Sequence, residues 1–198
     1  MEIKPVDQNL IPVFSGDKTT LRSYVTACEY LIEEFLNPNP NNARMARRLL
    51  MIFMGKLEGR AREAVDANRI PTSWPELKEI LVHSFGDKRS EDVLVHDLNN
   101  VTPKTNESAQ DYAVRIKGTL YTLLSKINLT EDNLYIRHMK INQYNQLALR
   151  TFLFGLDMIN EKLGMEVKLR QPGDIETAEG YAIEIENYNI DISKSESQ

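Results

Sequence analysis

Apolar residues recur along this chain at the three- and four-residue spacing of a helix face, and no stretch alternates apolar and polar residues as a half-buried strand does. The pattern is clearest between residues 109 and 127, at Ala109, Tyr112, Ala113, Ile116, Leu120, Leu123, Leu124 and Ile127. No repeat of solenoid length accompanies it. The sequence therefore predicts an all-α fold.

The first half of the chain predicts three helices. Residues 21–35 form an apolar face that includes Cys28, with Asp17 as the expected N-cap and the prolines of residues 37–42 as the stop. The next pattern, residues 43–66, is apolar nearly all round, which is typical of a helix in the middle of a bundle, and its methionines are expected to fill the core.

The third helix has clear signals at both ends. Ser73 and Glu76 have the spacing of a capping box, and Gly86 follows the last apolar position. Trp74, the only tryptophan, is expected in the core. The polar residues 87–90 that follow are the expected hinge between two lobes.

The second half predicts several more helices. Ser108 and Asp111 are expected to cap the helix that starts near residue 109. A long helix or a broken pair is expected over residues 132–154, with Gly155 as its stop, followed by a short helix over 157–163 that ends at Gly164 and a last helix over about 172–187.

Charge and cysteine content limit the function classes. The 198 residues carry a net charge of −5, which argues against a strongly basic nucleic-acid binder. The single cysteine cannot form an internal disulfide, and it is expected to be buried. Without a secretory signal pattern or an apolar run long enough to span a bilayer, the expected location is the cytoplasm, with no membrane partner.

Basic residues are concentrated in the segment between residues 43 and 62. An arginine fork can bind phosphate, but no aromatic side chains interleave with these residues for base stacking. Two interpretations stay open, a solvated helix face and a contact with a polyanion or another copy of the chain. The arginines concerned are Arg44, Arg47, Arg48, Arg60 and Arg62.

No catalytic or cofactor-binding motif occurs in the sequence. Nucleotide-binding glycine loops, zinc-protease, serine-hydrolase and aspartic-protease signatures are all missing. The three histidines, His83, His96 and His138, lie in separate predicted helices without metal-ligand spacing. We expect no enzyme activity, no metal and no cofactor.

The order of several short segments resembles a known family. FSGD near the start, LEGRAREAVD, SWPELKEILVHSFGD, ESAQDYAVRIK and TFLFGL, followed by an acidic helix, are similar in order and spacing to the capsid region of Gag from gypsy-type LTR retrotransposons. The neuronal Arc proteins and other domesticated Gag proteins descend from such elements. The resemblance covers roughly residues 10–187.

This resemblance implies two lobes of retrotransposon capsid type, helical bundles joined by a short hinge. The N-terminal lobe would cover residues 10–87, the C-terminal lobe 90–190, and a disordered tail 191–198. Glu107, Tyr112 and Arg115 would occupy the place of the retroviral major homology region. The side chains expected to build the family core are Phe14, Trp74, Phe85, Tyr112, Phe152, Phe154 and Leu156, with Gly155 as the helix stop.

The resemblance also implies a structural function. Such subunits form homo-oligomers through dimers of the C-terminal lobe, and these build virus-like particles that enclose retrotransposon RNA. The CCHC zinc knuckle that binds RNA in Gag does not occur here. RNA contact is therefore expected to be indirect or to come through a missing nucleocapsid module. The sequence would then be either a fragment of a longer Gag or a domesticated gene.

Two functions remain open at this stage. The first is a self-assembling capsid protein. The second is an Arc-like host adaptor that binds a peptide or protein partner through a groove in one lobe. Tyr135, Met139 and Tyr144, which are large and partly off the apolar stripe of their helix, are the candidates for a self-association contact.

Overall fold

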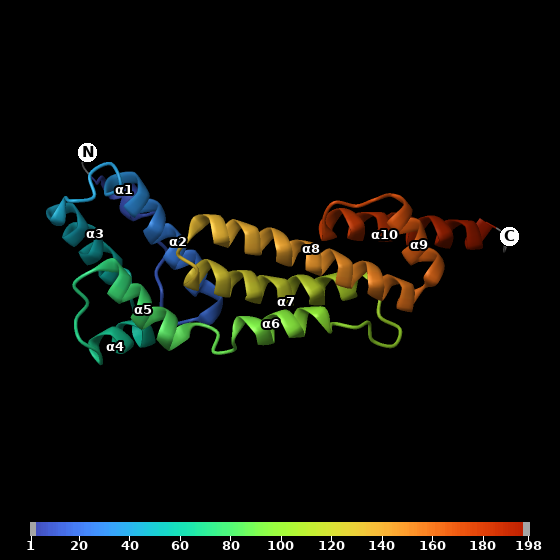
Figure 1. Ribbon diagram of the computed structural model, residues 1–198, viewed down its shortest axis with the longest axis horizontal. Helices are drawn as coiled ribbons and strands as arrows, with labels where there is room; N and C mark the ends of the chain where they lie inside the picture. The colour runs from blue at the N-terminus through green and yellow to red at the C-terminus, as the bar shows by residue number, and fades with distance from the viewer. Residues whose placement is uncertain (1–2, 196–198) are drawn as a thin grey trace. The chain divides into compact units, whose positions relative to one another are not determined.

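The structure, a computed structural model, describes residues 3–195, and the side chains of residues 3–188 (Figure 1). All regular secondary structure in this range is helical, which confirms the predicted all-α class. The helices are α1 (Pro5–Gln8), α2 (Lys18–Phe35), α3 (Ala43–Gly55), α4 (Gly59–Asp66), α5 (Trp74–Phe85), α6 (Glu91–Asn99), α7 (Ala109–Thr130), α8 (Leu134–Ile159), α9 (Glu161–Leu169) and α10 (Ile175–Ser195).

The chain divides into two compact units between Lys88 and Arg89. The first unit contains α1 to α5 and the second α6 to α10. Helix α10 continues to Ser195, five residues past the boundary at 190 expected for the second lobe. Residues 196–198 of the expected tail lie outside the described residues.

Aromatic side chains organise the core of the first unit, in which α2 packs on α3 and α5. Phe14 is fully buried and stacks on Tyr24, with ring centroids 5.4 Å apart, and meets the edge of Phe85 at 5.5 Å. Trp74 meets Phe53 edge to face at 5.1 Å. Trp74 and Phe85 are half-buried, so both line the core as expected but reach its margin.

The single helix expected over residues 43–66 is wrong, because the chain breaks between α3 and α4. The extended residue Phe14 forms a bridge with Leu57 there. The Phe14 N–H donates to Lys56 O at 2.9 Å, and the Glu58 N–H donates to Phe14 O at 2.9 Å. These backbone bonds replace the ones that a continuous helix would make. Met51, expected to fill the core, is 65% exposed.

The sequence predicts the N-terminal cap of α2 correctly, but not that of α5. Asp17 caps α2 as predicted, and its Oδ1 accepts from the Thr19 N–H at 2.7 Å. The capping box at Ser73 is wrong, because the Ser73 side chain makes no cap bond. Glu76 accepts instead from the N–H of Thr72 at 2.8 Å, one residue earlier in the chain.

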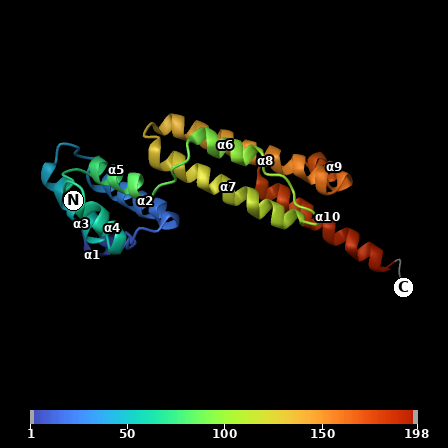
Figure 2. The same ribbon diagram turned by 90° about the horizontal axis from the view of Figure 1, so that it is seen from below.

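In the second unit, α7 and α8 lie side by side and antiparallel, connected by a short turn (Figures 1 and 2). Helix α6 packs on both, and α10 packs on α7, α8 and α9. The interfaces form one hydrophobic core drawn from all five helices. Its largest fully buried members are Tyr112, Phe152 and Leu94.

Two expectations for the stretch RTFLFGL are wrong. Helix α8 does not stop at Gly155 but continues to Ile159, with Gly155 buried in its interior. Phe154 is 67% exposed, while its neighbours Phe152 and Leu156 are fully buried, because the 3.6-residue helical repeat places 152 and 156 on the inner face and 154 on the outer one.

The short helix expected over residues 157–163 is also wrong. The chain turns at Asn160, whose Oδ1 accepts from the N–H groups of Lys162 (3.0 Å) and Leu163 (3.2 Å) and so starts α9. Gly164 lies inside α9 rather than at its end. A Cβ added at Gly164 would lie 2.2 Å from Asp157 Oδ1 and 2.9 Å from the Asp157 backbone nitrogen, so this glycine allows the close turn of α9 onto α8.

Candidate assembly surface and the Glu107–Arg115 network

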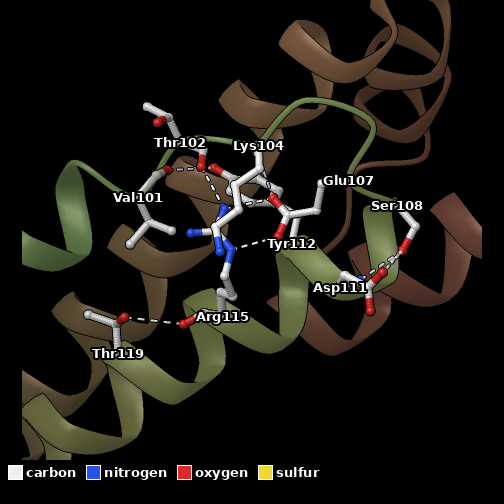
Figure 3. Close-up of polar contacts among 9 residues, drawn as sticks. All are labelled: Val101, Thr102, Lys104, Glu107, Ser108, Asp111, Tyr112, Arg115 and Thr119. Carbon is white, nitrogen blue, oxygen red and sulfur yellow. Dashed lines mark hydrogen bonds and ion pairs between the residues drawn. The ribbon is translucent and has the colours of Figure 1, made fainter.

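A bidentate ion pair joins the loop before α7 to the second turn of that helix (Figure 3). Arg115 Nε lies 2.6 Å from Glu107 Oε1, and Arg115 Nη2 lies 2.6 Å from Glu107 Oε2. The same Nη2 donates to the carbonyl oxygen of Thr102 at 2.6 Å. One guanidinium group on α7 therefore binds the loop of residues 101–108 near both ends of the loop, at Thr102 and at Glu107.

The local sequence places Glu107 for this contact. Ser108 is the N-cap of α7, as predicted, and its Oγ accepts from the Asp111 N–H at 3.0 Å. Glu107 therefore precedes the helix directly, and its Oε2 accepts from the Lys104 N–H at 2.8 Å. Arg115 lies two helical turns further on, and its long side chain reaches back to Glu107.

The ion pair changes the acidity of both partners. Hydrogen bonds from Arg115, opposed by partial burial and supported by the Lys104 N–H, lower the pKa of Glu107 from 4.5 to about 2. The same hydrogen bonds raise the pKa of Arg115. The Glu107 carboxylate is thus charged over the whole neutral and weakly acidic range.

Tyr112 connects this network to the core. Its hydroxyl lies 2.8 Å from Val101 O and 3.0 Å from Thr151 O, and donates its single proton to these two carbonyl groups. Burial raises the pKa of this phenol to about 12. The Arg115 guanidinium lies 5.6 Å from the centre of the Tyr112 ring, within the range of a cation–π contact.

The three residues singled out at the expected major homology region therefore form one connected cluster in space. It links α7, the preceding loop and α8 through side-chain-to-backbone bonds, and every contact in it is structural. The network stabilises the fold, because the Glu107 carboxylate, the Nε and Nη2 atoms of Arg115 and the Tyr112 hydroxyl are all paired with protein groups.

A second feature of this unit is an exposed apolar cluster at the start of α8, which we call the α8 cluster. Tyr135 and Met139 are 73% and 55% exposed, as expected for a contact surface. Leu134 and Ile136, which the sequence did not single out, are 64% and 40% exposed beside them. Asn133 caps this helix end by accepting from the Tyr135 and Ile136 N–H groups at 3.0 and 3.2 Å.

Tyr144 does not belong to this surface, and its assignment as an exposed contact is wrong. The Tyr144 side chain is only 6% exposed. It lies on the inner face of α8, five residues after Met139. Its hydroxyl donates to Glu91 at the start of α6. Burial, followed by this hydrogen bond to a carboxylate, raises the pKa of Tyr144.

Glu91 and Lys140 form ion pairs near the α8 cluster, and the sequence did not predict them. Lys140 Nζ lies 2.9 Å from Glu91 Oε2 and 3.4 Å from Glu131 Oε2. Burial opposes ionisation of Glu91, but the hydrogen bonds from Tyr144 and Lys140 outweigh it and lower the pKa of Glu91. These bonds hold α6 and the α7–α8 turn against α8, and so give the exposed cluster a fixed support.

The five arginines singled out for a polyanion contact are divided between two helices of the first unit, α3 and α4. Arg60 Nη2 donates to Gly16 O at 2.9 Å, and Arg62 donates to Met54 O at 3.2 Å and pairs with Asp66 at 3.4 Å. Arg48 Nη2 lies 3.5 Å from Ile3 O. Arg44 and Arg47, on the exposed face of α3, remain the members best placed for a polyanion.

Within the described residues, no group of three or more His, Cys, Asp and Glu side chains is arranged to hold a metal ion. None of the helices described there combines the length and apolarity that a bilayer crossing requires. Comparison of the chain with known protein families, with curated proteins and with solved structures found no match.

Proposed function

We propose that this chain is a structural subunit of Gag capsid type, which associates with copies of itself to build particles that enclose RNA. The two compact units of helices would be the two lobes of such a subunit. The Glu107–Arg115 network would hold the second unit rigid, at the position where the sequence resembles the major homology region. RNA would be held indirectly or through a nucleocapsid module.

The observation that carries this proposal is the α8 cluster. Isolated exposed apolar residues are ordinary on protein surfaces. Here four of them, Leu134, Tyr135, Ile136 and Met139, lie within six residues at one helix end, each at least 40% exposed. Exposed apolar side chains gathered at one supported helix end are typical of a protein contact surface, and tyrosine and methionine are enriched in such surfaces.

The cluster suits contact with a second copy related by twofold symmetry. Side chains on one face of a helix end can meet the same side chains of another copy, which is the arrangement of most homodimers. A shell needs only weak contacts of this kind, because each subunit makes several of them and the free energies add across the particle. The mechanism of the protein would then be geometric rather than catalytic.

The test is sedimentation equilibrium of the full chain over a range of protein and salt concentrations, with negative-stain microscopy of the same samples. The wild type is expected to form dimers or larger particles. Tyr135→Ala/Met139→Ala is expected to weaken dimerisation by about tenfold or more, the effect of losing one central aromatic contact.

The matched control is Met165→Ala/Leu169→Ala, an apolar pair of the same four-residue spacing on α9 with exposures of 62% and 70%. It removes a similar exposed area elsewhere in the same unit and is expected to leave association unchanged. A wild type that stays monomeric at every concentration would overturn the capsid proposal and favour the adaptor function. Equal effects of the two double variants would show that the α8 cluster is not the interface.

A further inference from the structure

A groove on the second unit lies beside the Glu107–Arg115 network and shares Arg115 with it. It has a volume of about 750 Å³, within the range of small-molecule sites. Helix α6, the loop after it and the middle of α7 form its walls. The lining residues that matter for its chemistry are Arg89, Asp97, Lys104, Arg115, Gly118 and Thr119.

Cationic side chains outnumber carboxylates among the residues that line the groove, although the whole chain has a net charge of −5. Three cationic side chains line it, at positions 89, 104 and 115, with one carboxylate among the lining residues. That carboxylate, Asp97, is paired with Arg89 at 2.8 Å. Glu107 does not line the groove, but its carboxylate pairs with Arg115 and offsets the charge of that guanidinium, so Lys104 supplies the lining positive charge for which no ion pair is seen among the described residues.

The guanidinium of Arg115 presents one edge to the groove. Glu107 and Thr102 bind its Nε and Nη2 atoms. No hydrogen bond among the described residues uses the other terminal nitrogen, Nη1. Val101 and Thr119 both line the groove. The network therefore holds this lining arginine in place through Nε and Nη2 and leaves the Nη1 donors for a ligand, so the side chain is already ordered before an oxyanion binds.

Gly118 makes room at the floor of the groove. It lies in the middle of α7, where glycine destabilises a helix relative to alanine. A Cβ added at Gly118 meets no atom within 4 Å, so close packing of the protein does not explain this glycine. The missing side chain leaves the space above α7 open beside Arg115.

We propose that this groove binds a small molecule that carries a phosphate group. Arg115 Nη1 and the Lys104 ammonium would contact the phosphate oxygens, and the bare surface at Gly118 would receive the rest of the ligand. Phosphate is favoured because its several oxygens can accept from a guanidinium edge and an ammonium together. The ligand could be a nucleotide or an inorganic phosphate compound, which share this chemistry.

The test is isothermal titration calorimetry of the full chain with sodium pyrophosphate and, separately, with ATP. Saturable binding at one site per chain is expected for at least one of them. Tighter binding of ATP would assign the site to nucleotides, and equal affinities would assign it to the phosphate group alone. Lys104→Ala is expected to weaken binding by about fivefold, the effect of one exposed charge contact.

Gly118→Gln provides the decisive variant, because its side chain would fill the floor of the groove without a clash at Cβ. It is expected to abolish binding while raising the unfolding temperature, since a better helix former replaces glycine. Gly180→Gln is the matched control: Gly180 lies inside α10, and a Cβ there also meets nothing within 4 Å. It should raise the unfolding temperature and leave binding intact.

The absence of saturable heat with both ligands would overturn the proposal. So would wild-type affinity in Gly118→Gln, or an equal loss in Gly180→Gln. Binding of an RNA oligonucleotide without binding of either small ligand would reject a small-molecule site. None of these outcomes depends on self-association, so this proposal and the capsid proposal can fail separately.

Discussion

The ring of Tyr112 on α7 occupies the space that a side chain at Gly155 on α8 would need. A Cβ added at Gly155 would lie less than 3.0 Å from the Tyr112 ring and hydroxyl. The phenol can reach the carbonyl groups of Val101 and Thr151 only because α8 carries no side chain there. A glycine that looks like a helix stop in the sequence is thus the contact point of the two longest helices of the second unit.

Gly155→Ala is therefore expected to destabilise the protein even though alanine favours helices. Overpacking and disturbance of the Tyr112 hydrogen bonds should cost about 1–3 kcal/mol, more than the roughly 1 kcal/mol that helix propensity returns. Urea denaturation measures the change. Gly180→Ala, in an open helical position, should instead stabilise by a few tenths to about 1 kcal/mol. Equal stabilisation by both changes would contradict the contact.

The two phenylalanines of TFLFGL, Phe152 and Phe154, should differ sharply in how much they contribute to the free energy of unfolding. Phe152 is fully buried and stacks on Tyr112 with centroids 5.8 Å apart, whereas Phe154 is 67% exposed. Phe152→Ala is expected to lower the free energy of unfolding by about 3–5 kcal/mol, and Phe154→Ala by less than about 0.5 kcal/mol. Chemical denaturation of the two variants, which differ only in position, checks this. A comparable loss in both would mean that α8 is rotated from the orientation described.

The Glu107–Arg115 pair should make stability depend on acid pH. Because the pKa of Glu107 is lowered from 4.5 to about 2 in the folded protein, its stabilising contribution is complete above about pH 4.5 and is lost as the pH falls toward 2. Glu107→Gln should cost about 1–2 kcal/mol at pH 7, a modest value because Arg115 is partly exposed.

The measurement is the free energy of unfolding of wild type and Glu107→Gln between pH 7 and pH 2. The difference between them should shrink as the pH falls from 4.5 toward 2, because the unfolded wild type then gains a proton at Glu107 before the folded form does, whereas glutamine does not titrate. Glu34→Gln, at an exposed position of α2, serves as the control and should follow the wild type at every pH. A constant difference down to pH 2 would contradict the lowered pKa.

Cys28 should be unreactive while the first unit is folded. The side chain is fully buried on α2, and burial raises the pKa of its thiol. Because the thiolate is the reactive form, a thiol reagent such as DTNB should label it only at the rate of unfolding. The labelling rate should rise in step with the unfolded fraction in urea. Rapid labelling without denaturant would contradict the burial of this residue.

Much of the helical architecture follows from the sequence alone. The 3.6-residue spacing of apolar residues identifies the inner faces of α2 and α7, and the Asp17 and Ser108 caps mark where these helices begin, because both signals act within a few residues of the chain. The burial of Cys28 and Tyr112 follows from the same spacing. Local patterns of this kind need no knowledge of distant contacts.

Only the tertiary structure decided where a helical pattern is interrupted and which partner each side chain finds. The backbone of Phe14, over forty residues away, supplies the hydrogen bonds that end α3, and the ring of Tyr112 explains Gly155. Tyr144 is buried where its hydroxyl donates a hydrogen bond to Glu91 of another helix, and Arg115 lines a groove while Glu107 binds its Nε and Nη2 atoms. The sequence determines which residues can form helices, but their partners depend on distant segments that no local pattern specifies.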